Sequence, residues 1–360
     1  MVWSCRRTGP DTGQSGSMLK AHHKLALFME GALGLSEGKM GYGLLRYSHN
    51  EIIAVIDSAH AGLNQKAITG INRDVLVVAT IEEALARGAN TLVLSIAPSG
   101  GRIPEDWLAK IDQAHDLGMN LVNGLHDRLE LRYTSSKPGQ WVWDVRVEPE
   151  DISTGKGYAA HLENRRVLMI GTDMAVGKMT AGLELLEAAR KRGINSGFVA
   201  TGQIGIVITG EGVPLDAIRL DYAPGAVERE VLRHRDQELV IIEGQGALNH
   251  PGSSASLPLL RGSMPSHMVL CHRAHQETLF RLPEYPIPPL PELIQRWEDL
   301  ASMNGLFPRA KVAAIALNTQ DLDAAESLKE MEELQTELKL PVGDFVRFGA
   351  DAALESILAD

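Results

Sequence analysis

One stretch of the sequence combines an apolar run, a glycine-framed loop and an apolar helical stripe, in that order. Residues 167–170 form the run, the loop extends from Gly171 to Gly177 and Lys178, and residues 183–189 carry the stripe. This order predicts a strand, a phosphate loop of the Walker A kind and a helix. The loop N–H groups and the helix N-terminus would form a nest for phosphate oxygens, while Lys178 adds a positive charge. The sequence therefore predicts an anion site.

The loop departs from the usual phosphate loop in two respects. Gly171 lies one residue farther from Gly177 than usual, and Met179 stands where Ser or Thr normally binds Mg²⁺. Thr180 then offers the nearest hydroxyl for a phosphate or a metal. The pattern indicates a phosphate site more directly than a magnesium site. The alternative is a glycine-rich turn with a solvated lysine.

Composition is that of a folded globular protein. Of the 360 residues, 44% are apolar and 22% are charged, enough to bury the cores of two or three domains. The formal charge of −11 argues against a general attraction to nucleic acid or to an anionic membrane. No apolar run approaches the roughly 20 residues that a membrane span needs. An anionic ligand therefore requires a local cluster such as the phosphate loop.

The N-terminal residues and the cysteines indicate the cellular compartment. Residues 1–17 contain two arginines without a following apolar stretch, so they do not resemble a secretory signal. We interpret them as a disordered leader or a cloning remnant, with Met18 as the natural start. Cys5 and Cys271 are too far apart in sequence to indicate a disulfide framework or a metal knuckle. A reducing cytoplasm fits this cysteine usage.

Residues 18–155 are predicted to form a first α/β domain. Helices expected at 80–88 and 105–117 separate apolar runs that end in polar or glycine-rich turns. The predicted strands are 51–57, 75–79, 91–96 and 120–122. This alternation predicts a parallel, doubly wound sheet that binds ligands at the carboxyl ends of its strands. No G-x-G-x-x-G follows the first predicted strand, which argues against a nicotinamide cofactor.

Residues 133–164 are richer in polar residues and are predicted to be a linker, with Trp141 and Trp143 giving it some packing. The second domain, residues 156–360, is predicted to be a P-loop NTPase-like, doubly wound parallel sheet. Beyond the strand before the phosphate loop, its predicted strands are 197–200, 238–242, 268–271 and 312–317. The five prolines in 283–291 indicate a rigid extended connector. Residues 323–339 are predicted to form a helix that packs through Leu328, Met331, Leu334 and Leu338.

Three motifs of the second domain carry a family resemblance. They are Gly171-Thr172-Asp173 with Gly177-Lys178, then Glu243-Gly244-Gln245-Gly246, and Asn318. In this order they resemble dethiobiotin synthetase. With Met179-Thr180 included, the chain more closely resembles P-loop proteins formerly of unknown function and now associated with D-glutamate N-acetyltransferase, over nearly everything after Met18. The first domain also resembles, over 50–128, the Rossmann-type domain that binds coenzyme A in acyl-CoA synthetases.

The closer resemblance implies transfer of an acetyl group from acetyl-CoA to the amino group of D-glutamate. The partners expected are then small molecules, neither nucleic acid nor membrane, with a further copy of the chain in a homo-oligomer. The residues expected to contact the cofactor are Gly171, Thr172, Asp173, Gly177, Lys178, Met179, Thr180, Gln245 and Asn318. If the reaction uses Mg²⁺, Thr180 and Glu243 are expected to hold it, since an acidic residue at a strand tip beside a phosphate loop commonly does so.

Acetyl transfer to an amine needs a base and a site for the substrate carboxylates. The candidates for the base are Glu243, His250, His126 and Asp57, because histidines and partly desolvated carboxylates titrate near neutral pH. Carboxylates favour arginine and backbone N–H partners. Arg102, in a loop with Ser99, Gly100 and Gly101, is the first choice for the carboxylates, ahead of Arg46 and Arg273 near other strand ends.

Two other functions remain open at this point. The first is an ATP-Mg²⁺-dependent ligase or kinase of the dethiobiotin synthetase type, against which Met179 argues. The second is a regulatory module that binds phosphates without turnover. A ligase or kinase releases ADP, acetyl transfer releases a free thiol, and a regulatory module releases neither.

Overall fold

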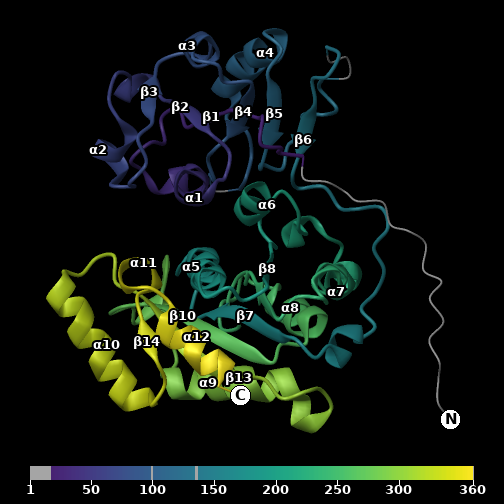
Figure 1. Cartoon of the computed structure of the whole chain (residues 1–360), viewed down its shortest axis with the longest axis vertical. Coiled ribbons are helices and arrows are strands. Elements are labelled where there is room, and N and C mark those ends of the chain that lie inside the picture. The colour runs from purple at the N-terminus through teal and green to yellow at the C-terminus, as the bar shows by residue number, and fades with distance from the viewer. Residues whose placement is uncertain (1–17, 99, 134–136, 360) are drawn as a thin grey trace.

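Two α/β halves, each built on a parallel sheet, are packed one on the other (Figure 1). The computed structural model describes residues 18–98, 100–133 and 137–359. The leader predicted for residues 1–17 and the candidate Ser99 lie outside these ranges. The predicted fold class, a Rossmann-like half followed by a P-loop half, is confirmed. Among the described residues, no helix combines the length and apolar character needed to cross a bilayer.

The first sheet has the strand order β3-β2-β1-β4-β5-β6, with every pair parallel. Its strands are β1 (Leu25–Phe28), β2 (Ile52–Ile56), β3 (Leu76–Val78), β4 (Thr91–Leu94), β5 (Asn120–Asn123) and β6 (Val142–Asp144). The order reverses between β1 and β4, the point at which open α/β sheets form a ligand crevice. The four predicted strands are confirmed.

Two strands of this sheet were not predicted. β1 is short and fully buried, so it lacks the alternating pattern that marks a strand, although it occupies the centre of the sheet. β6 lies within the predicted linker at the edge of the sheet, and of its residues only Asp144 is buried. The interpretation of 133–164 as a linker is therefore wrong for β6, because pairing with β5 rather than apolar burial defines this strand.

Helices cover both faces of the first sheet. They are α1 (Lys39–Tyr47), α2 (Gln65–Thr69), α3 (Ile81–Ala86) and α4 (Leu108–Asp116). α3 begins as predicted, since the Thr80 hydroxyl accepts a hydrogen bond from the Glu83 backbone N–H at 3.2 Å. α3 and α4 pack on one face, and α1 packs on the face turned toward the second half of the chain.

The second sheet has the strand order β14-β13-β10-β7-β9-β8 and is also parallel. Its strands are β7 (Arg165–Gly171), β8 (Ser196–Val199), β9 (Leu239–Ile242), β10 (His267–Arg273), β13 (Lys311–Asn318) and β14 (Val342–Gly343). The predicted strands are confirmed, and the short β14 is added. β7, which leads into the phosphate loop, lies between β9 and β10.

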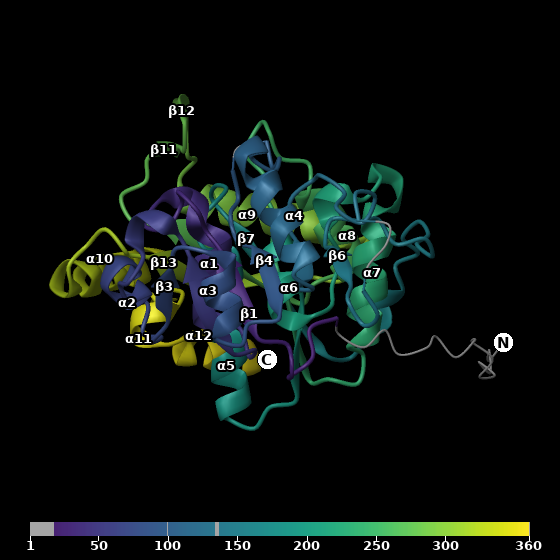
Figure 2. The same ribbon diagram turned by 90° about the horizontal axis from the view of Figure 1, so that it is seen from above.

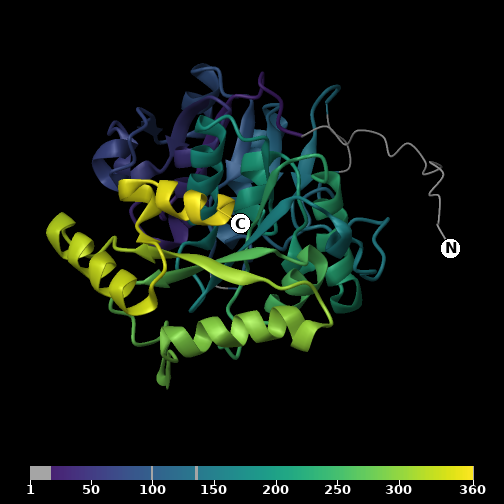
Figure 3. The ribbon, with the colours of Figure 1, turned by 60° about the horizontal axis from the view of Figure 1, so that its bottom comes forward.

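The helices of the second half again form two layers (Figure 3). They are α5 (Lys178–Lys191), α6 (Gln203–Thr209), α7 (Ala223–Arg233), α8 (Ser256–Ser263), α9 (Leu290–Ser302), α10 (Ala324–Leu338), α11 (Phe345–Phe348) and α12 (Asp351–Leu358). α5 and α12 cover the face turned toward the first half, whereas α7, α8 and α9 cover the other face. The phosphate loop and its helix therefore lie beside the junction of the two halves.

Two predictions for the second half need correction. Part of the proline-rich segment pairs as a hairpin of β11 (Thr278–Leu279) and β12 (Leu282–Pro286), which projects from the body in Figure 2. Proline is compatible with this small, exposed hairpin because few ladder hydrogen bonds are required there. In α10, Leu328 is 54% exposed and Ser327 is buried in its place. The buried face of α10 is the one that carries Met331 and, four residues earlier, Ser327.

One apolar cluster joins the two halves of the molecule. It extends from the inner face of the first sheet through α1 to α5, α6 and the inner face of the second sheet. A Cβ atom on Gly43 of α1 would lie 2.6 Å from Ile204 Cγ2 and 3.3 Å from Met179 Cε. Helix α1 can therefore approach α6 and the phosphate-loop helix only with glycine at this position. The position of each half depends on the other.

We predict that Gly43→Val destabilises the protein by roughly 1–3 kcal/mol, as expected for overpacking of a close helix contact. Urea denaturation measures the free energy of unfolding. Glu332→Val, on the exposed face of α10, is the matched control. Because Ile204 is the nearest obstacle, adding Ile204→Ala should remove part of the loss. If the losses of unfolding free energy in the two single variants simply add in the double variant, this contact does not position α1.

Candidate functional site

The phosphate loop joins the carboxyl end of β7 to the first turn of α5. Its backbone takes positive φ angles at Ala175 (57°) and at Gly177 (106°), which turns the chain so that α5 begins at Lys178. The Lys178 side chain is buried, and its Nζ donates a hydrogen bond to the Asp173 carbonyl oxygen at 2.8 Å. The loop is thus folded around a lysine held near its centre.

Burial lowers the pKa of Lys178 to about 8, although Cys271, Asp173 and Glu243 each oppose the shift. A buried ammonium has lost most of its water and gains most from a bound anion. The geometry therefore suits Lys178 to hold a phosphate oxygen.

Close backbone contact explains the glycine after Glu243. A Cβ atom on Gly244 would lie 1.6 Å from the Met169 carbonyl oxygen and 3.0 Å from Lys178 Cδ. Only glycine fits where the chain leaving β9 passes beside β7. The Glu243-Gly244 motif therefore has a packing reason that does not depend on a catalytic role.

Glu243 lies at the tip of β9 and is 3% exposed. Its Oε2 accepts hydrogen bonds from the backbone N–H groups of Thr201 at 2.9 Å and Gly202 at 3.1 Å, and its Oε1 accepts one from Gln245 Nε2 at 3.3 Å. Burial raises the pKa of Glu243 to about 7, against these hydrogen bonds and the Lys178 charge. The structure places Glu243 and Gln245 together, as a support for the turn that starts α6.

The pair predicted for Mg²⁺ presents little oxygen to the loop. The Glu243 carboxylate is directed to the start of α6, and the Thr180 hydroxyl interacts with the Tyr47 hydroxyl of α1. Met179 extends toward Gly43. Within the described parts of the chain, no three His, Cys, Asp or Glu side chains cluster as metal ligands. The use of Mg²⁺ stays a prediction, and no step below depends on it.

Asp173 connects the loop to the projecting hairpin. Its fully buried carboxylate accepts hydrogen bonds from the backbone N–H of Met174 at 2.6 Å, from Gln276 Nε2 at 2.7 Å and from the backbone N–H of Phe280 at 2.6 Å. Asp173 therefore positions the hairpin over the loop.

Thr172 is the residue of the loop that directly follows β7, and Asn318 is the last residue of β13. The Thr172 hydroxyl is 3.0 Å from His272 Nδ1, and the Thr172 carbonyl oxygen accepts a hydrogen bond from Asn249 Nδ2 at 3.0 Å. The Asn318 amide nitrogen is 3.9 Å from where a Cβ on Gly177 would lie. The structure therefore brings both predicted contact residues to the phosphate loop.

A hollow of about 310 Å³ adjoins the loop and the hairpin. Its lining includes the loop residues Met174 and Ala175, the apolar Phe280, and the cations Arg273 and Arg281. It lies where the second sheet changes strand order, between β7 and β10. Arg273 also pairs with Asp321, with Nη1 and Oδ2 3.3 Å apart.

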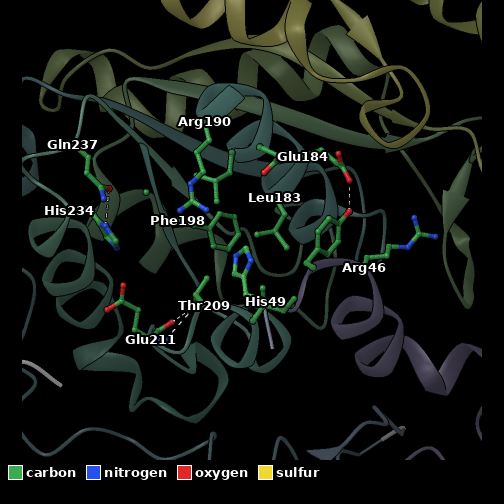
Figure 4. Close-up of a pocket in the computed structure, with 15 residues that line it drawn as sticks. Arg46, His49, Leu183, Glu184, Arg190, Phe198, Thr209, Glu211, His234 and Gln237 are labelled. Carbon is green, nitrogen blue, oxygen red and sulfur yellow. Dashed lines mark hydrogen bonds between the residues drawn. The ribbon is translucent and has the colours of Figure 1, made fainter. Parts of the chain in front are cut away.

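A larger hollow, of about 410 Å³, lies elsewhere along the junction (Figure 4). Arg46 and Tyr47 from the end of α1 line it together with Glu184, Arg190 and Phe198 of the second half. No residue of the phosphate loop contributes to this lining. We take the smaller hollow as the candidate ligand site because residues of the phosphate loop line it.

His126 lies at the junction, exposed, in the loop that follows β5. Its backbone N–H donates to the Gly101 carbonyl oxygen at 2.7 Å, and its ring Nε2 is 2.5 Å from Arg146 Nη1. Arg146 Nη1 also lies 3.3 Å from Asp216 Oδ2 of the second half. Partial desolvation and the Arg146 charge lower the pKa of His126. The structure brings His126 to the interface of the halves.

Arg102, the first choice for the substrate carboxylates, is already paired. Its side chain is 75% exposed, and its Nη1 lies 2.9 Å from Asp127 Oδ1. Gly100 and Gly101 form the turn before it, with φ of 82° and 64°. Arg146, which the sequence analysis did not select, is the more buried arginine of this region.

The other two candidates for the base hold backbone turns. His250 is 8% exposed, and its Nδ1 accepts a hydrogen bond from the Gly252 N–H at 3.0 Å. Asp57 is fully buried and accepts from the backbone N–H groups of Leu33 at 3.2 Å and Ala59 at 3.0 Å. Both side chains therefore stabilise local loop structure.

Three cations of the junction were missed by sequence reasoning: Lys39, Arg146 and Arg281. Lys39 begins α1, after the glycine-rich turn that follows β1. Because β1 was not predicted, this turn was not recognised as a loop at the carboxyl end of a strand. Arg146 follows β6, in the segment predicted to be a linker, and Arg281 lies in the hairpin within the proline-rich region. Each of these residues was missed because the strand or hairpin next to it was not predicted.

Both halves of the chain are similar to known protein domains. Residues 153–354 match the family described as the domain of unknown function DUF1611_C, a P-loop domain, and residues 58–148 match DUF1611_N, a Rossmann-like domain. The crystal structure of a DUF1611 family protein from Anabaena variabilis is 46% identical, with a TM-score of 0.90 over 94% of this chain and 100% of that one.

Two relatives carry the same functional name. A protein of Tritonibacter scottomollicae named D-glutamate N-acetyltransferase is 33% identical over 338 residues, which are 92% of this chain and 98% of the relative. A protein of Pseudoalteromonas with the same name is 35% identical over 294 residues, covering 80% of this chain and 86% of the relative.

We predict that Lys178→Met weakens the binding of a phosphate-bearing ligand, with CoA as the probe, about 10- to 100-fold, as expected for the loss of a charge-assisted hydrogen bond. Calorimetric titration at pH 7 measures it. Because the pKa of Lys178 is about 8, wild-type affinity should fall as pH rises through that value and the lysine loses its proton. The variant should show no such fall. Lys191→Met, 73% exposed on the same helix, is the control. Equal affinity of wild type and Lys178→Met would remove the loop from the site.

We predict that Glu243→Gln keeps the stability within about 1 kcal/mol, whereas Glu243→Ala loses about 2–4 kcal/mol because two buried N–H groups lose their acceptor. The measured quantity is the free energy of unfolding in urea. The folded pKa is raised from 4.5 to about 7, so wild-type stability should fall, relative to Glu243→Gln, as pH rises between those values. Glu238→Gln, exposed at the start of the same strand, should show no such trend. A stable alanine variant would contradict the supporting role.

Proposed function

Because this chain belongs to the DUF1611 family, with its Rossmann-like and P-loop domains, we propose that it transfers the acetyl group of acetyl-CoA to the amino group of D-glutamate. The observation that carries the proposal is the relative named D-glutamate N-acetyltransferase, which aligns with 92% of this chain. The relatives' names point to an enzyme of the N-acetyltransferase class. Acetyl-CoA as the donor and D-glutamate as the acceptor are proposed in addition. A cytoplasmic location is proposed with them.

The phosphate loop supports CoA as the donor. CoA carries phosphate groups, and a nest of backbone N–H groups with Lys178 can bind a phosphate without cleaving it. The adjoining hollow, lined by Arg273, Arg281 and the ring of Phe280, offers cations and an apolar surface to the rest of the molecule. In this proposal the loop positions the donor.

His126 is the proposed base. It is exposed at the junction, and partial desolvation and the Arg146 charge lower its pKa, which favours the neutral ring. Glu243 is instead occupied by Thr201 and Gly202, and His250 by Gly252. Among the four candidates, His126 is the one whose side chain is exposed and so accessible to a substrate.

The proposed reaction follows from these assignments. His126 takes one proton from the substrate ammonium, and the resulting amine nitrogen forms a bond to the thioester carbonyl carbon. The tetrahedral intermediate then collapses, the carbon–sulfur bond breaks, and the CoA thiolate takes a proton from the histidine. The amide nitrogen releases its second proton to solvent. The thioester is already activated, so the enzyme needs to orient the amine and remove its proton.

We predict that the purified protein releases free thiol from acetyl-CoA only when D-glutamate is present, and that ATP-Mg²⁺ does not change the rate. A thiol-specific dye and mass detection of N-acetyl-D-glutamate measure the two products. L-Glutamate, at the same concentration, is the control for the acceptor. ADP release without thiol would assign the chain to the ligase or kinase class. Absence of both products would leave a phosphate-binding regulatory protein.

A further inference from the structure

Arg146 is an unusually placed cation at the junction of the two halves. Its side chain is 10% exposed, with Nη1 2.5 Å from His126 Nε2 and 3.3 Å from Asp216 Oδ2. Its buried Nε has no hydrogen-bond partner in the described structure. A buried guanidinium with an unused donor is costly unless a ligand completes its hydrogen bonds.

Lys39 lies within electrostatic range of both Arg146 and Arg281. Charges of Arg146 and Arg281 both lower the pKa of Lys39, after the larger effect of its partial burial. The Glu37 carbonyl accepts a hydrogen bond from the Ala97 N–H at 2.8 Å, which brings the start of α1 to the loop after β4. That loop ends at Gly101, where a Cβ atom would lie 2.9 Å from Arg146 Nη1. We name Lys39, Arg146 and Arg281 the junction cluster.

The junction cluster has more positive than negative charge. The acids that interact with its members are Asp216 and Glu37, and both side chains are solvent-accessible. Like charges that converge from α1, the end of β6 and the hairpin repel one another when no anion is bound. Such an arrangement indicates an anion-binding site.

We propose that the junction cluster binds the carboxylates of the acceptor amino acid, with Arg146 as the principal contact. This inference rests on the proposed function, since it names the place of its acceptor. The planar fork of arginine matches a carboxylate in two parallel hydrogen bonds. Asp216 beside it suits the ammonium group of the same ligand and would repel a phosphate. Arg281 belongs both to the junction cluster and to the hollow beside the phosphate loop, so acceptor and donor sites are neighbours.

Arg146 would also control the base. A guanidinium has no acceptor, so its Nη1 donates to His126 Nε2 and occupies the lone pair of the base. A carboxylate that draws Arg146 away frees Nε2 next to the substrate ammonium. The other charges that act on His126 are Asp216, Arg102 and Asp127. Arg146 is therefore a positioning residue for His126 as well as a substrate contact.

The first test is steady-state kinetics of Arg146→Gln and Arg146→Lys. We expect the KM for D-glutamate to rise about 10- to 100-fold in the glutamine variant and less in the lysine variant, with the KM for acetyl-CoA unchanged. Lys39→Gln, at an exposed position, should give a smaller rise and tests the cluster even if Arg146→Gln does not fold. Arg235→Gln, 68% exposed, is the control. A rise in the KM for acetyl-CoA alone would assign the cluster to a CoA phosphate and overturn the proposal.

Two further readouts separate this inference from the proposed function. In the pH profile of kcat/KM, the acid limb should shift in Arg146→Lys, because a different cation then faces His126. Calorimetric titration with glutarate, an unreactive dicarboxylate, should show binding to wild type and at least tenfold weaker binding to Arg146→Gln. If Arg146→Gln binds glutarate more weakly but wild type releases no thiol, the carboxylate site is supported and acetyl transfer is rejected. Equal glutarate affinity, with D-glutamate-dependent thiol release intact, would reject the site alone.

Discussion

The structure depends on one layer of apolar contacts shared by its two halves. Gly43 permits α1 to pack against Ile204, and the side chain of Met179 fills the neighbouring space. This contact also accounts for the odd residue of the phosphate loop. A hydroxyl-bearing residue at 179 would leave this space poorly filled, whereas methionine is flexible enough to fit an irregular gap. The loop has therefore exchanged a metal-binding side chain for one that fixes it to the other domain.

Two kinds of anion site follow from this arrangement. The phosphate loop is built from backbone N–H groups and a lysine that is almost fully desolvated, which suits a compact phosphate. The junction cluster is built from side chains of three separate elements and contains the fork of Arg146, which suits a planar carboxylate. Asp173 ties the position of the hairpin that carries Arg281 to the phosphate loop.

The sequence predicted the strands that are long or bounded by clear turns, the phosphate loop and the two-sheet architecture. It failed where burial or pairing, rather than pattern, defines an element. β1 is a buried tetrapeptide without alternation, and β6 is recognised only by its pairing with β5. Arg146 follows β6, so its proximity to His126 could not be foreseen. Glu243 was selected for the right place at a strand tip, but the direction of its carboxylate depends on Thr201, a residue from another strand end.

The continuous core has a consequence for the history of the gene. A domain with a sealed surface can be duplicated, fused or exchanged by recombination, since it brings its whole core with it. Here each half, taken alone, would display the apolar face that the other half covers. A recombinant that received α1 from one ancestor and the phosphate-loop helix from another would have to inherit matching residues at 43, 179 and 204 together. We therefore expect an exchange of one half alone to cost the stability of both.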